Sequence, residues 1–121
     1  MNHDVLVVED EPDLVATYER LLHRHGYRVV STGSRAAGLA AIRSGRPLLL
    51  ITDLRLPDGD GLDVVRAARA LPTPTPVIVV TGFGASRPAA MAAGATAFLT
   101  KPFSTETFTK LVRTILEAGP G

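Results

Sequence analysis

The stretch Val5-Leu6-Val7-Val8-Glu9-Asp10-Glu11-Pro12 joins a short apolar run to three acids and a proline. Four consecutive apolar residues, three of them β-branched, are typical of a strand buried on both faces. Proline is favoured in the first turn of a helix, so a helix is expected to begin directly after the acids. The stretch therefore predicts a strand, an acidic turn and a helix, with carboxylates at the carboxyl end of the strand.

The same alternation repeats five times along the chain. The apolar runs are Val5–Val8, Arg28–Val30, Leu48–Thr52, Val77–Thr81 and Ala97–Thr100. The helix-length segments are Asp13–His25, Arg35–Arg43, Leu62–Ala70, about Pro88–Ala93 and Thr105–Glu117, the last with Ser104 as its N-cap. Strands that alternate with helices predict the α/β class, here a doubly wound, five-stranded parallel sheet with helices on both faces, as in flavodoxin-like folds.

Length and composition exclude several classes of protein. The 121 residues suit one domain, and the absence of cysteine excludes a disulfide scaffold, thiolate metal sites and a cysteine nucleophile. No apolar run approaches the ~20 residues that a membrane span needs. The net charge of +1 and the lack of arginines interleaved with aromatics predict no nucleic-acid surface. We expect a cytoplasmic domain over residues 1–121, either a whole protein or the amino-terminal part of a longer chain.

Polar residues follow four of the five apolar runs. They are Glu9 and Asp10 after the first run, Asp53 after the third, Thr81 at the end of the fourth, and Lys101 after the fifth. The carboxyl ends of parallel strands meet at one edge of the sheet, where ligands bind. Converging carboxylates repel one another unless a cation lies among them, and Mg²⁺ prefers oxygen ligands. The pattern predicts a metal beside a carboxylate that becomes phosphorylated, with a lysine and a hydroxyl to stabilise the phosphoryl group.

This ordered set resembles the receiver domains of two-component response regulators. The resemblance is carried by the motifs Val5 to Pro12, Asp53-Leu54-Arg55-Leu56-Pro57-Asp58-Gly59-Asp60-Gly61, Thr81-Gly82 and Lys101-Pro102-Phe103. It covers nearly the whole chain at compatible spacings. It implies the strand order 2-1-3-4-5 and a phosphorylation-controlled signalling switch rather than a turnover enzyme.

The resemblance also implies roles for individual residues. Asp53 accepts the phosphoryl group, and Lys101 and Thr81 stabilise it. The Mg²⁺ ligands are Glu9, Asp10, Asp53 and the backbone carbonyl of Arg55. Phe98 turns inward with Thr81 during switching, and the peptide bond before Pro102 is cis.

Partners follow from the same resemblance. The donor is a sensor histidine kinase or a histidine phosphotransfer protein, and the changed face binds a downstream effector protein or domain. Direct contact with nucleic acid or membrane is not expected of this domain, and a homodimer is left open. The kinase, the pathway and the output are not predicted.

Three departures from the family pattern stand out. Glu9 replaces the more common aspartate, and its longer side chain would reach the metal through a water molecule. In the family that the chain resembles, the positions of Arg55 and Phe83 border the path by which water reaches the phosphoryl group, and we hypothesise that both residues lengthen the phosphorylated state. The segment between Thr81 and Gly94 is shorter than in most relatives, which leaves open whether the output face on the fourth helix is changed.

Other interpretations remain at this point. One is a degenerate receiver that only docks a partner, independently of phosphorylation. A Mg²⁺-dependent phosphatase would need a second aspartate two residues after Asp53, where Arg55 stands, and a flavin module would need a Ser/Thr/Gly-rich loop after the first strand. Asp58, Asp60 and Asp63 are interpreted as turn and capping residues.

Overall fold

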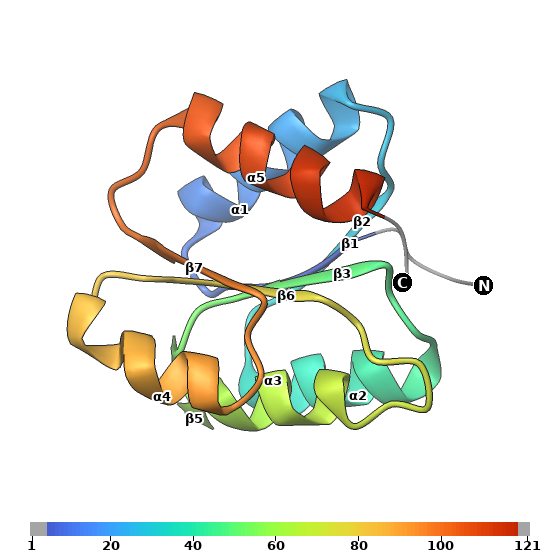
Figure 1. The fold of residues 1–121 in the computed structure, drawn as a ribbon, viewed down its shortest axis with the longest axis vertical. Coiled ribbons are helices and arrows are strands. Elements are labelled where there is room, and N and C mark those ends of the chain that lie inside the picture. The colour runs from blue at the N-terminus through green and yellow to red at the C-terminus, as the bar shows by residue number, and fades with distance from the viewer. Residues whose placement is uncertain (1–4, 119–121) are drawn as a thin grey trace.

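The computed structural model describes residues 5–118, in which strands and helices alternate along the chain. The five long strands form one parallel sheet in the order β2-β1-β3-β6-β7 (Figure 1). They are β1 (Val5–Val8), β2 (Val29–Thr32), β3 (Leu49–Thr52), β6 (Val77–Thr81) and β7 (Ala97–Thr100). Counted among these five, the order is 2-1-3-4-5, so the predicted class and topology are confirmed.

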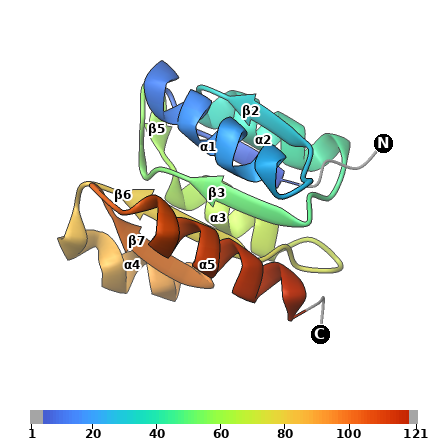
Figure 2. The same cartoon turned by 90° about the horizontal axis from the view of Figure 1, so that it is seen from above.

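Helices cover both faces of the sheet (Figures 1 and 2). One face carries α1 (Pro12–Arg24) and α5 (Thr105–Glu117). The other carries α2 (Arg35–Ser44), α3 (Leu62–Arg69) and the short α4 (Arg87–Ala92). Ser104 caps α5 as predicted, because its hydroxyl accepts a hydrogen bond from the Thr107 N–H.

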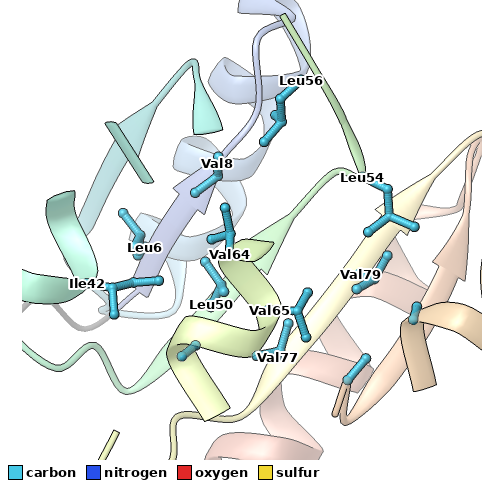
Figure 3. Close-up of a cluster of buried hydrophobic side chains, with 13 residues drawn as sticks. Leu6, Val8, Ile42, Leu50, Leu54, Leu56, Val64, Val65, Val77 and Val79 are labelled. Atoms are coloured by element: carbon cyan, nitrogen blue, oxygen red, sulfur yellow. The ribbon is translucent and has the colours of Figure 1, made fainter. Parts of the chain in front are cut away.

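The core consists of two hydrophobic layers that share the sheet. Alternate residues of β1 point to opposite faces, so Val5 and Val7 join one layer while Leu6 and Val8 join the other. All four are fully buried, which explains why this strand is a continuous apolar run. Figure 3 shows the layer beneath α2 and α3, in which Leu50 and Val64 pack beside β1.

Several predicted boundaries were wrong by one or two residues. The second strand spans Val29–Thr32 rather than Arg28–Val30, because Ser31 and Thr32 pair with β1 through their backbones. The third strand begins at Leu49, since Leu48 is exposed. The first four helices likewise shift by a residue at one or both ends, whereas the fifth is confirmed.

Two small features were not predicted. A short antiparallel hairpin, β4 (Arg55–Leu56) and β5 (Gly59–Asp60), lies between β3 and α3. A 3₁₀ turn, η1 (Gly84–Ser86), leads into α4. Within residues 5–118, none of the helices has the length and apolar character that crossing a bilayer requires.

Candidate functional site

Three charged residues converge at the carboxyl edge of the sheet. Glu9 follows β1, Asp53 follows β3 and Lys101 follows β7. The Lys101 Nζ atom lies 2.7 Å from Asp53 Oδ2 and 3.0 Å from Glu9 Oε1. Glu9 is 2% exposed and Asp53 is 8% exposed, so two buried carboxylates contact one ammonium group.

Backbone hydrogen bonds hold the second oxygen of each carboxylate. Asp53 Oδ1 accepts from the Leu54 N–H at 2.6 Å and from the Arg55 N–H at 3.3 Å. Glu9 Oε2 accepts from the N–H groups of the next two residues at 3.1 and 3.2 Å. Each carboxylate is therefore fixed on one side by the main chain and on the other by Lys101.

The ladders between strands continue into the site. The Glu9 N–H donates to the Thr32 carbonyl, the Asp53 N–H donates to the Val8 carbonyl at 3.1 Å, and the Lys101 N–H donates to Thr81 at 2.8 Å. These bonds keep the three functional residues in register beyond the ends of their strands. Sheet geometry thus places the charged side chains.

The charges of the pocket are unbalanced. Burial raises the pKa of the Glu9 carboxyl above its ordinary value, although the hydrogen bond and charge of Lys101 act in the opposite direction. Burial also works to lower the pKa of Lys101, but its hydrogen bonds to Asp53 and Glu9 prevail, so this pKa is raised and the ammonium stays charged at neutral pH. One lysine facing two buried acids leaves an excess of negative charge, and Glu11 adds a further carboxylate 3.6 Å from Nζ.

The donor chemistry of this pocket fits a hard divalent cation. Its ligating atoms are carboxylate oxygens, and Asp10 adds an exposed carboxylate next to Glu9. In the described part of the chain, no three acidic, histidine or cysteine side chains form a ready-made metal cluster, and Lys101 Nζ lies between Glu9 and Asp53. The fit to Mg²⁺ therefore rests on oxygen donors and uncompensated negative charge.

Three further predicted residues lie beside this pocket, namely Thr81 at the end of β6, Arg55 in β4 and Phe83 after β6. Thr81 ends β6, is 1% exposed and has its Oγ1 atom 3.5 Å from the Phe83 N–H. The guanidinium carbon of Arg55 lies 3.3 Å from the centroid of the Phe83 ring, although both side chains are exposed. This cation–π stack joins the loop after β3 to the loop after β6.

The remaining predicted residues lie on or after β7. Phe98 is half-buried, and the guanidinium of Arg87 lies 5.8 Å from its ring centroid. The Lys101–Pro102 peptide bond is cis. Phe103 then stacks on Tyr18 in the layer beneath α1 and α5.

The acids of the hairpin cap two different helices. Asp60 Oδ1 accepts from the Leu62 N–H at the start of α3, as expected of a turn residue. Asp58 instead accepts from the first two N–H groups of α2, those of Arg35 at 2.6 Å and Ala36 at 2.9 Å. These two hydrogen bonds, from Ala36 and then Arg35, lower the pKa of Asp58. The sequence does not reveal this contact because its partners are more than 20 residues apart.

Gly61 is a further residue whose importance the sequence did not reveal. Its backbone lies in the ordinary right-handed helical region, with φ −66° and ψ −13°, so no unusual dihedral angle requires glycine. A Cβ atom at this position would overlap the carbonyl oxygen of Asp53 and lie 2.9 Å from the Leu54 Cα atom. Glycine is needed here because the backbone at the candidate site passes so close.

Comparison with known proteins places the chain in a family. The family model of the response regulator receiver domain matches residues 5–113. The chain is 36% identical over 114 residues to the probable transcriptional regulatory protein TcrX of Mycobacterium tuberculosis, covering 93% of this chain and 49% of that protein. It is 31% identical over 121 residues to the photosynthetic apparatus regulatory protein RegA of Rhodobacter capsulatus, covering 98% of this chain and 66% of RegA. The chain thus spans half to two thirds of the length of these relatives.

Solved structures agree with this placement. A putative response regulator from Chloroflexus aurantiacus is 30% identical with a TM-score of 0.86, covering 97% of this chain and 99% of that one. The receiver domain of the sensor histidine kinase PA1611 from Pseudomonas aeruginosa is 26% identical with a TM-score of 0.84 over the same shares, and it coordinates a magnesium ion in its active-site cleft.

The chain belongs to the response regulator receiver domain family. It is therefore a receiver domain of the two-component class, a signalling switch and not a classical enzyme. The resemblance inferred from the ordered motifs is confirmed.

Proposed function

We propose that this domain is a switch controlled by phosphorylation of Asp53. A phosphohistidine of a sensor histidine kinase or a histidine phosphotransfer protein is the donor. An oxygen of Asp53 forms the new bond to phosphorus while the phosphorus–nitrogen bond breaks and its electron pair stays on the imidazole. The product is an acyl phosphate, which hydrolysis returns to the carboxylate.

The contact between Lys101 and Asp53 is the observation that carries this proposal. A buried aspartate held on one oxygen by backbone N–H groups is a positioned nucleophile, and phosphoryl transfer depends mainly on positioning and charge neutralisation. Lys101 Nζ lies 2.7 Å from Asp53 Oδ2, so it is close enough to bind the phosphoryl oxygens that are added to Asp53. Thr81, buried on the neighbouring strand, supplies a hydroxyl donor.

Mg²⁺ is the proposed cofactor, and the residues that would hold it are Glu9, Asp10, Asp53 and the backbone carbonyl of Arg55. When bound, it would neutralise charge on the phosphoryl oxygens and orient them. The excess negative charge at Glu9 and Asp53 supports this assignment.

The proposed output is a change in the face formed by α4, β7 and α5. Thr81 moves toward the phosphoryl group, and Phe98 moves inward into the space released. Half-burial of Phe98 beside Arg87 supports a side chain that can occupy either position. A downstream effector protein or domain, or a second copy of the chain, then binds the altered face.

The cellular location and the domain context of the switch are also proposed. We place it in the cytoplasm, as one receiver domain over residues 1–121 that can form the amino-terminal part of a longer regulator. Transcriptional output, as the name of TcrX suggests for that longer protein, would need a further segment. This domain itself is proposed to contact neither nucleic acid nor membrane.

Arg55 and Phe83 are proposed to set the lifetime of the phosphoryl group. Their stack joins the loop after β3 to the loop after β6, and we propose that this bulky pair hinders the water molecule that attacks the phosphoryl group. We expect faster loss of the phosphoryl group in Phe83→Ala and in Arg55→Ala. Arg113→Ala on α5, where Arg113 pairs with Glu117, is the matched control. Unchanged lifetimes in both site variants would refute this role.

Intact mass spectrometry after incubation with MgCl₂ and acetyl phosphate tests the main proposal. We expect one added phosphoryl group in the parent protein, none in Asp53→Ala, and none when EDTA replaces MgCl₂. Glu117→Ala, which removes an exposed acid on α5 instead, should still be phosphorylated. A folded parent protein that gains no mass would refute phosphorylation and favour the phosphorylation-independent docking module.

A further inference from the structure

The loop between Asp53 and Leu62 carries the backbone of the proposed site but has little structure of its own. Its hairpin consists of two strands of two residues each, joined at Arg55 opposite Asp60 and Leu56 opposite Gly59. An isolated hairpin is marginal in water even when longer, so this one needs support from outside.

Asp58 supplies that support at the tip of the hairpin. Its two carboxylate oxygens accept hydrogen bonds from the first two N–H groups of α2, at 2.6 and 2.9 Å. These N–H groups have no partner within the helix, and the positive end of the helix dipole favours a carboxylate there. The tip is therefore attached to α2, which packs against β1 and α3.

Arg35 extends the attachment to α3. From the first position of α2, its Nε and Nη2 atoms lie 2.8 and 2.7 Å from Asp63 Oδ2. The same side chain passes against the hairpin, since a Cβ atom at Gly59 would lie 2.8 Å from the Arg35 Cδ atom. Asp58, Arg35 and Asp63, which we call the α2 clamp, thus hold α2, the hairpin and α3 together.

The opposite end of the hairpin reaches the candidate site directly. The Arg55 N–H donates to Asp53 Oδ1 at 3.3 Å, and the Gly61 N–H donates to the Leu54 carbonyl at 2.8 Å. A displacement of the hairpin tip therefore changes the position of the Arg55 backbone, whose carbonyl is a proposed metal ligand.

We propose that Asp58 is a positioning residue for the phosphorylation site, acting through the α2 clamp to fix the Arg55 backbone. The inference rests on the proposed function, because it assigns a role toward the proposed Mg²⁺ site. Mutation of residues that orient metal ligands commonly weakens metal affinity by 10- to 100-fold, so the effect of losing such a residue can be measured.

The test compares two variants that each remove a cap from the same helix end. Asp58→Ala removes the clamp, whereas Ser34→Ala removes the α2 N-cap, whose hydroxyl accepts from the Ala37 N–H at 3.1 Å. Both should lower the urea midpoint of unfolding. Amide hydrogen exchange of residues 55–60 is measured in metal-free protein, and Mg²⁺ affinity is measured from the melting temperature at increasing MgCl₂ concentration.

We expect faster exchange in the hairpin and about tenfold weaker Mg²⁺ binding for Asp58→Ala. Ser34→Ala should leave both unchanged, and Asp58→Asn, which keeps one acceptor oxygen, should fall between the parent and Asp58→Ala. Equal hairpin exchange and equal Mg²⁺ affinity in Asp58→Ala and Ser34→Ala would overturn the positioning role. If the parent protein itself bound no Mg²⁺, the proposed function would fail instead, and exchange in the metal-free protein would still decide whether the clamp exists.

Discussion

Replacing Gly61 with alanine tests how closely the backbone is packed behind Asp53. The added methyl group would overlap the Asp53 carbonyl oxygen and lie 3.0 Å from the carbonyl carbon and 2.9 Å from the Leu54 Cα atom. All three atoms belong to the main chain, so no flexible side chain can move aside. The Gly61 N–H bond to the Leu54 carbonyl, at 2.8 Å, also prevents the two segments from separating freely.

The expected loss of stability follows from two opposing effects. Introducing a methyl group into a well-packed site costs about 1–3 kcal/mol, and contacts with fixed backbone belong at the upper end of that range. Alanine also restricts the unfolded chain, which returns about 0.4–1 kcal/mol where the native dihedral angles suit it, as they do at Gly61. We therefore expect Gly61→Ala to lower the free energy of unfolding by about 2 kcal/mol.

Equilibrium unfolding in urea measures this change. With a slope of about 2 kcal/mol per molar urea, the midpoint should fall by about 1 M. Gly82→Ala is the control, since no described atom lies within 4 Å of a Cβ atom there, and it should be neutral or slightly stabilising. Gly38→Ala is an intermediate case. Its Cβ atom would lie 3.0 Å from a Val8 methyl group, but the gain in helix propensity of about 1 kcal/mol offsets this crowding. A Gly61→Ala protein as stable as Gly82→Ala would refute the steric argument.

Three further perturbations test the charges and the core. Lys101→Met leaves the buried acids Glu9 and Asp53 without their cation. It should lower the free energy of unfolding by about 3 kcal/mol, measured in urea without metal. Adding Glu9→Gln to this variant should restore part of the lost stability. The contribution of Asp58 to the free energy of unfolding should depend on pH. The pKa of Asp58 is lower in the folded state than its ordinary value of 3.8. The stabilisation by Asp58 is therefore complete above pH 3.8 and is lost as the pH falls through the folded-state pKa. The difference in melting temperature between the parent and Asp58→Asn should therefore shrink in strong acid, and a constant difference would contradict this sign. Phe108→Ala, in a fully buried position, should cost about 3–5 kcal/mol in urea unfolding, and a loss below 1 kcal/mol would contradict its place in the core.

The sequence predicted most of the sheet because the inner strands are buried on both faces. β1, β3 and β6 are continuous apolar runs for that reason, and their positions were predicted to within one residue. The edge strand β2 was predicted with wrong boundaries, since its half-buried residues Ser31 and Thr32 pair through the backbone and have no apolar signature. The hairpin β4–β5 was missed because strands of two residues are too short for any periodicity.

The candidate site was predictable where it depends on sheet topology. Glu9, Asp53 and Lys101 each follow a strand, and parallel strands bring those positions to one edge. The clamp contact of Asp58 with the start of α2 was not predictable, because a capping carboxylate that lies 23 residues away along the chain leaves no local sequence pattern. The close approach at Gly61 was equally hidden, since its dihedral angles are ordinary and the requirement is one of space.

The pocket combines a rigid backbone with unbalanced charge. Ladder hydrogen bonds fix the main chain of Glu9, Asp53 and Lys101, which limits how far their side chains can separate. Burial raises the pKa of Glu9 because keeping the charge of its carboxyl out of water costs free energy. A cation that binds the folded state alone would relieve this cost and stabilise the domain by about 2.7 kcal/mol at 100 times its dissociation constant. The free domain is thus held in a form that gains stability from the ligand its proposed chemistry requires.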